Sequence, residues 1–159
     1  MDDTAMDLQA LGEELNRLLA METRGLARHL DQATPYLSAD TYSVWHEVRQ
    51  MLSTNADHAA RISGLLASLE LPERPFPFDP AVANFHYTDL ACLLPVLIDE
   101  QRARVTAYQR AIEHCGADAK AADTSAALQG LLDDNQTQLD RLEAHHRRIA
   151  GGSALAERG

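Results

Sequence analysis

The sequence predicts an all-α fold, a four-helix bundle with one long crossover between its second and third helices. Apolar residues recur at spacings of three and four along four separate stretches, as on the buried face of an α-helix. Short connections follow the first and third stretches, whereas residues 71–87 form a middle connection long enough to run the length of a helix. The first and fourth helices are therefore expected to run one way, and the second and third the other.

The first two helices are predicted over residues 5–33 and 39–70. The apolar face of the first is Leu8, Leu11, Leu15, Leu18, Leu26 and Leu30. Pro35 ends this helix, because proline cannot continue the backbone hydrogen-bond ladder. Ser38 or Asp40 can cap the second helix. Its apolar face includes Trp45, Val48, Met51, Ile62, Leu65, Leu66 and Leu69.

The crossover, residues 71–87, carries four prolines in its first ten residues, so it is not helical throughout. It also holds all three phenylalanines of the chain. These are Phe76, Phe78 and Phe85, and Tyr87 lies close to them. We expect this aromatic cluster to cap the bundle; the alternative is a contact in a homo-oligomer, with a dimer favoured.

The third predicted helix covers residues 88–115, with Thr88 or Asp89 as its cap and Gly116 as its stop. Pro95 either kinks this helix or marks its first turn.

The fourth predicted helix covers residues 123–149, with Leu128, Leu131, Leu132, Leu139, Leu142 and Ile149 on its apolar face. The last residues, 151–159, are expected to be a flexible tail. Residues 1–150 then form a single domain, as is usual for a chain of this size.

The chain is strongly acidic: 14 lysines and arginines stand against 24 aspartates and glutamates, a net charge of −10. This charge repels phosphate backbones and anionic lipids, so we expect neither nucleic acid nor a membrane as a partner. The acidic start differs from a basic targeting sequence, and no apolar run reaches the roughly 18 residues of a membrane span. Cys92 and Cys115 lie on one predicted helix, too far apart to form a disulfide, which fits a cytoplasmic location.

Polar residues interrupt the apolar face near the middle of each predicted helix. They are Glu22 in the first helix, Asn55 and His58 in the second, Glu100 in the third, and Asn135 and Gln138 in the fourth. Because the first and fourth helices run opposite to the second and third, these residues fall at one level of the bundle. The neighbouring layer on one side is wholly apolar, with Leu15, Leu65, Ala107 and Leu131. On the other side, His29 and His145 form a candidate second polar layer.

With these residues in this order, residues 5–149 resemble the ferritin-like superfamily, which includes ferritins and rubrerythrins. The resemblance implies two metal ions, held by one glutamate from each of two helices and a Glu-x-x-His pair from each of the other two. By position, the lone glutamates correspond to Glu22 and Glu100. The two pairs correspond to Asn55 with His58, and to Asn135 with Gln138.

Both positions of the bridging glutamates thus carry neutral amides, Asn55 and Asn135. Without those charges a di-metal centre keeps a buried excess of positive charge, so a di-iron site is not expected. One alternative is a single iron, manganese or zinc ion held by Glu22, His58 and Glu100. The other is a metal-free hydrogen-bond network of the same polar residues.

Asp57 and Asp134 neighbour the two amides but lie about 100° further round their helices. Either carboxylate would need a shift in helix register to join the central residues.

No nucleophilic triad, phosphate-binding loop or Cys-x-x-Cys pair indicates another class of enzyme. Two functions remain. The first is a ferritin-like protein with a degenerate centre, either metal-free or holding one ion, that acts by binding. The alternative is a metal-dependent oxidase or iron-handling protein with an atypical site.

Overall fold

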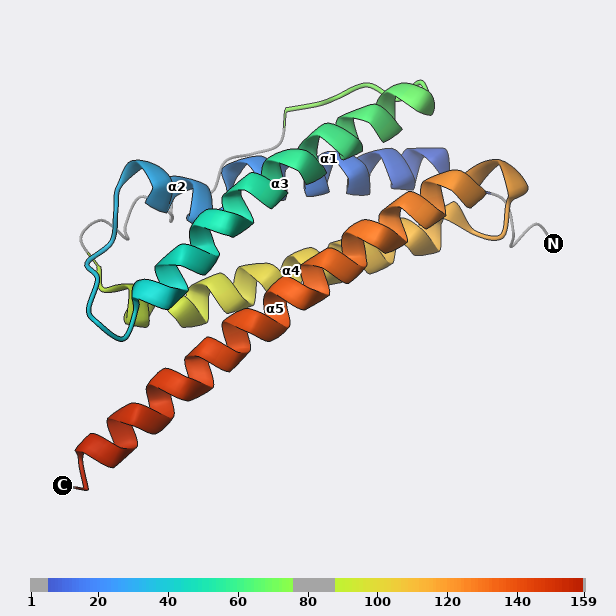
Figure 1. Ribbon diagram of the computed structural model, residues 1–159. Coiled ribbons are helices and arrows are strands. Elements are labelled where there is room, and N and C mark those ends of the chain that lie inside the picture. Colours follow the sequence, from blue (N-terminus) through green and yellow to red (C-terminus); the bar gives the residue numbers. More distant parts are fainter. Residues whose placement is uncertain (1–5, 76–87, 159) are drawn as a thin grey trace.

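The computed structural model describes residues 6–75 and 88–158, and within these ranges the chain is helical without a β-strand. The predicted all-α class is confirmed for this part of the chain. The elements are α1 (Leu8–Arg24), α2 (Leu26–Gln32), α3 (Tyr42–Ser68), α4 (Leu90–Cys115), a short 3₁₀ helix η2 (Ala119–Ala121) and α5 (Ala122–Ala156) (Figure 1). An isolated parallel β-bridge joins Tyr36 to Asp89.

The long helices lie side by side along a common direction. In Figure 1, α1 and α5 run from right to left, while α3 and α4 run from left to right. The most extensive packing is between α4 and α5, and α1 packs against both α3 and α4, whereas α3 and α5 touch less. Residues 76–87, which make up most of the predicted crossover and include its aromatic cluster, lie outside the described residues.

Most of the helix ends follow the predicted signals. The carboxylate of Asp89, one of the two predicted caps, accepts a hydrogen bond from the first turn of α4 at 2.8 Å. Asp7, for which no prediction was made, caps α1 in the same way at 3.0 Å. Gly116 ends α4 with a φ of 61°, a conformation that favours glycine. Thr41, rather than Ser38 or Asp40, is the N-cap residue of α3. Pro95 lies inside α4 and is exposed.

Two predicted boundaries differ from the structure. The helix predicted over residues 5–33 is broken at Gly25, whose backbone is extended (φ −67°, ψ 172°). The tail predicted over residues 151–159 is instead helical as far as Ala156, because α5 continues through Gly151 and Gly152. Once a helix is formed, adding a residue costs little, so two glycines at roughly 1 kcal/mol each need not end it.

The core consists of two apolar clusters with a polar layer between them. One cluster gathers residues such as Leu30, Val48, Leu93 and Leu142, and the other contains Leu11, Leu15, Ile62, Ala107, Leu128 and Leu131. The second cluster contains three of the four residues of the predicted apolar layer, and half-buried Leu65 packs against it. The polar layer therefore lies between two fully hydrophobic regions.

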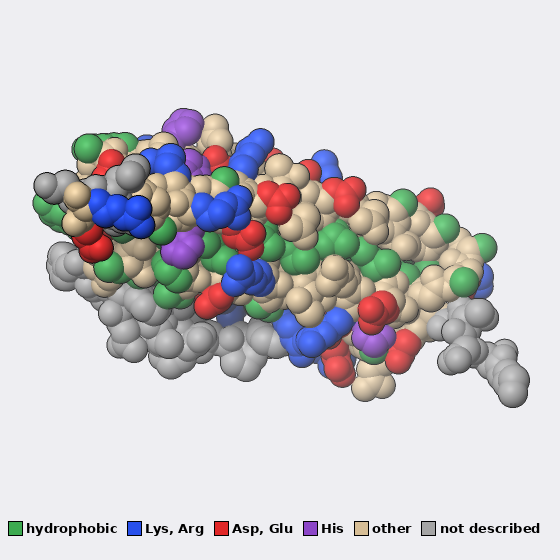
Figure 2. All heavy atoms as spheres, turned by 90° about the horizontal axis from the view of Figure 1, so that it is seen from below, with side chains coloured by type: hydrophobic (Ala, Val, Ile, Leu, Met, Phe, Trp, Pro, Cys, Tyr) green, Lys and Arg blue, Asp and Glu red, His purple; other side chains and the backbone are tan. Residues whose placement is uncertain are grey.

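The surface carries charges of both signs. Figure 2 shows a face on which basic and acidic side chains are interspersed around a strip of hydrophobic atoms. None of the helices in the described ranges is both long enough and apolar enough to span a membrane.

Candidate functional site

The candidate site is the set of polar side chains buried between the two apolar clusters, which we call the central network. Its members are Glu22 of α1, Asn55 and His58 of α3, Gln101, Arg104 and Tyr108 of α4, and Asn135 and Gln138 of α5. Each of these residues is at most 6% exposed. Burial of so many polar groups requires that they satisfy one another's hydrogen bonds.

Glu22 is the centre of this network. Its Oε1 accepts a hydrogen bond from the Tyr108 hydroxyl at 2.7 Å, and lies 3.4 Å from His58 Nδ1 and 3.5 Å from Asn135 Nδ2. Its Oε2 lies 3.9 Å from Arg104 Nε. With the Asn55 amide turned so that both of its polar atoms are satisfied, Asn55 donates to Oε2 at 3.3 Å. Every one of these neighbours offers a donor to the carboxylate.

The electrostatics keep Glu22 ionised. Burial alone would raise the pKa of this carboxyl, but the charge of Arg104 and the hydrogen bonds from His58 and Tyr108 outweigh burial and lower it. The pKa of Tyr108 is raised by burial and by the adjacent Glu22 charge. Tyr108 therefore remains a neutral phenol that donates its proton to a carboxylate.

His58 lies between two carboxylates. Its Nδ1 faces Glu22, and its Nε2 lies 3.2 Å from Asp134 Oδ2. Burial lowers the pKa of His58, but the hydrogen bonds and charges of Glu22 and Asp134 raise it by more. Because the Asp134 side chain is 56% exposed, His58 joins the buried carboxylate to one at the surface.

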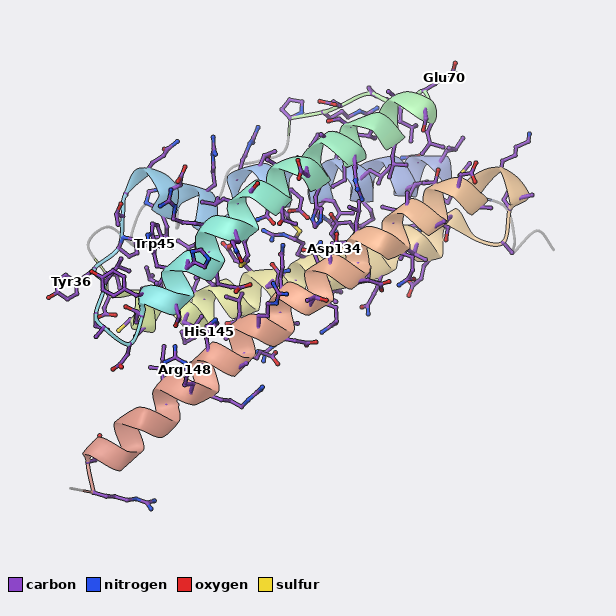
Figure 3. The ribbon with its side chains drawn as sticks, in the orientation of Figure 1. Tyr36, Trp45, Glu70, Asp134, His145 and Arg148 are labelled. Atoms are coloured by element: carbon purple, nitrogen blue, oxygen red, sulfur yellow. The ribbon has the colours of Figure 1, made fainter. Side chains whose placement is uncertain are left out.

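Asp134 reaches His58 without the shift in helix register that the sequence appeared to require. Asn135, the next residue, faces inward, while Asp134 lies at the edge of α5 that faces α3 (Figure 3). Asp57, the other neighbouring carboxylate, is exposed.

The buried amides are oriented by Arg104. A guanidinium can only donate, so Gln101 presents its Oε1 to Arg104 Nη1, at 2.8 Å. Gln101 Nε2 must then face acceptors, and it lies 2.9 Å from Asn135 Oδ1 and 3.2 Å from Gln138 Oε1. Asn135 in turn donates through Nδ2 to the Leu131 carbonyl at 2.8 Å. Arg104 thus determines which way the Gln101 amide is turned, and Gln101 in turn determines that Asn135 and Gln138 point their side-chain oxygens toward it.

Glu100 and Arg104 also fill the break at Gly25. Glu100 Oε2 accepts a hydrogen bond from Leu26 N, the first residue of α2, at 2.9 Å. Arg104 Nη2 donates to the carbonyl oxygen of Met21 near the end of α1, at 2.8 Å. An anion thus caps a helix N-terminus and a cation caps a helix C-terminus, which is the favourable arrangement for both helix dipoles.

The structure brings most of the predicted site residues together. Those that meet in the central network are Glu22, Asn55, His58, Asn135 and Gln138. Glu100 is half-buried and caps α2, and Gln101 takes the inward position on α4. His29 and His145 are half-buried and lie beyond this network, with His145 near Arg148 on α5 (Figure 3).

The sequence interpretation missed Gln101, Arg104 and Tyr108, which form one row along α4. The signal was available, because this row continues the buried residues Leu94 and Leu97 at spacings of three and four. The prediction instead put the neighbouring residue, Glu100, on the inner face of this helix. It therefore placed Glu100 in the interior where the structure has Gln101.

No protein-family model, no curated protein and no solved structure matches this chain. The fold and the site define a class in general terms, a helical bundle with a buried carboxylate surrounded by hydrogen-bond donors. Among the described residues, no group of three or more histidine, cysteine, aspartate or glutamate side chains is placed to hold a metal ion.

Proposed function

We propose that this chain is a ferritin-like bundle with a degenerate centre, in which an internal ion network takes the place of the metals, and that it acts as a binding protein rather than as an oxidase. The observation that carries the proposal is the position of Arg104. Its guanidinium lies beside Glu22, so a fixed positive charge of the protein already serves as the counter-ion of the carboxylate.

The donor set around Glu22 supports a centre that works without metal. A divalent ion needs several lone pairs that converge on one point. The groups that converge near Glu22 are N–H and O–H donors from Tyr108, Asn135 and Arg104. These groups suit a carboxylate and do not fit a cation.

The geometry of His58 also argues against a single ion held by the predicted set. The two ring nitrogens point in opposite directions, one toward Glu22 and the other toward Asp134, so these three groups do not converge. Glu100, the third predicted ligand, is engaged with the backbone of Leu26. To bind one ion together, His58 and Glu100 would both have to leave their present partners.

The ferritin-like relationship is supported by the helix directions and by the position of the network. α3 and α4 run in parallel, as in a bundle with a crossover between its middle helices (Figure 1). His58 and Asn135 lie in the middle parts of α3 and α5 and meet Glu22, which lies near the end of α1, as ligands from different helices meet in that superfamily.

As the binding function, we propose association with a second copy of the chain in the cytoplasm. Tyr36 and Tyr42 are 69% and 63% exposed, large apolar surfaces at the end of the bundle where α3 begins. Figure 3 shows Tyr36 pointing away from the helices. Light scattering at several concentrations tests this association: we expect a dimer, and a monomer at every concentration would contradict it.

The test of the metal-free centre is metal analysis of protein purified without chelator, together with thermal unfolding in the presence and absence of EDTA. We expect far less than one metal ion per chain and the same unfolding temperature in both conditions. Stoichiometric metal that is lost in His58→Ala, but kept in the exposed control His46→Ala, would contradict the proposal.

A further inference from the structure

A polar cavity of about 310 Å³ opens to solvent between α3 and α5. It is lined by Glu47, Gln50, Met51 and Thr54 from α3 and by Gln138 and Arg141 from α5. Its volume is at the small end of the range for ligand pockets, about 300–1,000 Å³, which suits a small metabolite.

The cavity lies where α3 and α5 are joined by ion pairs. On one side His58 contacts Asp134, one turn before Gln138 on α5. On the other side Arg141 Nη1 lies 3.4 Å from Glu47 Oε1. Polar contacts that join the two helices therefore lie at this opening.

Gln138 connects the cavity to the interior and presents a donor to it. Its Oε1 accepts from Gln101 Nε2, and this orientation is imposed by Arg104 through Gln101. Gln138 is 6% exposed, and among the described residues its amide nitrogen makes no hydrogen bond. The nitrogen keeps some contact with solvent, and a partly exposed amide N–H₂ group in the wall of a cavity can donate to an acceptor bound there.

The charged walls of the cavity have opposite signs. The Glu47 side chain is 14% exposed, whereas the Arg141 side chain is 58% exposed. Their single long contact uses one of five guanidinium N–H groups, so Arg141 keeps donors for a ligand. Arg141 and Gln138 are three residues apart on α5 and lie on the same face of that helix.

We propose that this cavity binds a small zwitterion of the amino-acid class. The carboxylate of the ligand accepts hydrogen bonds from Gln138 Nε2 and Arg141, and its ammonium group donates to Glu47. Met51, which is 3% exposed, provides an apolar wall for a short side chain. The site does not include Glu22, and its test involves no metal, so it can fail independently of the metal-free centre.

The test is a titration of the full-length chain with L-serine, followed by ¹H–¹⁵N NMR at the side-chain NH₂ signal of Gln138. The signal is assigned by its loss in Gln138→Glu. We expect a saturable shift with a dissociation constant on the order of 1 mM, as for a ligand of few atoms. No saturable shift up to about 50 mM, where such a site would be filled, overturns the proposal.

Matched variants separate this cavity from general charge effects. Arg141→Met should weaken L-serine binding by about tenfold or more, since it removes the charged donor. Arg102→Met is the control, because Arg102 has the same 58% side-chain exposure and also pairs with a glutamate of another helix, Glu143. An equal effect of both substitutions overturns the proposal.

The charge requirement of the ligand is tested with its two halves. Propionate carries the anion alone and ethylamine carries the cation alone, and each should bind at least about tenfold more weakly than L-serine. Propionate that binds as well as L-serine would overturn the zwitterion assignment. Glu47→Gln should reduce the difference in affinity between L-serine and propionate, because it removes the charge that the ammonium group of L-serine contacts.

Discussion

Glu22 and Glu100 are two carboxylates with the same predicted role, and they lie in different surroundings. Glu22 is buried among side-chain donors, with Arg104 as its counter-ion. Glu100 is half-buried and binds a backbone N–H at the start of α2. The comparison teaches that a glutamate predicted from sequence to be a metal ligand can serve two other purposes, to anchor a polar core or to cap a broken helix.

The largest expected effect comes from removing the counter-ion of Glu22. Arg104→Met leaves a buried, unpaired carboxylate, and we expect it to lower the free energy of unfolding by about 3–5 kcal/mol. Urea denaturation measures this loss. The exposed control Arg102→Met should change stability by at most about 0.5 kcal/mol, and equal losses in the two variants would show that burial of the pair is irrelevant.

A second substitution separates the charge from the packing at this centre. In Glu22→Leu with Arg104→Met, neither charge is left buried alone. We expect the double variant to be more stable than Arg104→Met by at least about 1 kcal/mol, as when a buried ion pair is replaced as a unit. Additive losses would mean that the two side chains do not interact.

The stability that the Glu22 region contributes should also depend on pH, because Glu22 contacts the titratable side chain of His58. The folded pKa of His58 is raised above its usual 6.5, so its contribution is complete below that pH and is lost as pH rises through the folded pKa. The pKa of Glu22 is lowered from 4.5, so its contribution is present above that pH and is lost as pH falls through the folded pKa.

We therefore expect His58→Gln to remove part of the loss of stability above pH 6.5, by about 1.4 kcal/mol for each unit of the pKa shift. The measurement is urea denaturation at several pH values from acid to alkaline. The exposed control His46→Gln should follow the wild-type profile. A His58→Gln profile parallel to that of the wild type would contradict the raised pKa.

A smaller effect is expected from the Glu100 side. Glu100→Ala removes the cap of α2 and should cost about 1 kcal/mol, which is typical for loss of a helix cap. Thermal or urea unfolding checks the value, with exposed Glu113→Ala on the same helix as the control. If Glu100→Ala lowered the free energy of unfolding by more than Arg104→Met does, the Glu100 region would contribute more to stability than the Glu22 region, contrary to this expectation.

The smallest effect is expected at the break itself. A Cβ on Gly25 would lie 3.2 Å from Arg104 Nη2, 3.2 Å from the Met21 carbonyl oxygen and 3.3 Å from Glu100 Oε2, so these neighbours must shift by a few tenths of an ångström. We expect Gly25→Ala to destabilise the protein by roughly 0.5–1 kcal/mol. Gly64→Ala, at an open helical position, should stabilise it by up to about 1 kcal/mol. A stabilising Gly25→Ala would show that the break is not closely filled.

The sequence predicted the all-α class and the inward direction of Glu22, His58 and Asn135, because buried faces leave a periodic pattern. It did not predict the break, because Leu18, Glu22 and Leu26 keep helical spacing across Gly25. What permits the break is the pair of partners on α4, and a one-dimensional pattern does not say which side chains of another helix will meet it. On α4 an error of one residue, about 100° of rotation, exchanged Gln101 for Glu100.

The two arms of the Arg104 guanidinium have a consequence for motion. One nitrogen holds the Met21 carbonyl at the break, and another orients Gln101 in the interior. If the last turn of α1 unwinds at the break, the Met21 carbonyl moves and Arg104 loses one of the partners that position it beside Glu22. Fluctuations of the end of α1 and of the buried carboxylate are thus coupled, so the slowest-exchanging backbone amides in the last turn of α1 should report on openings of the whole centre.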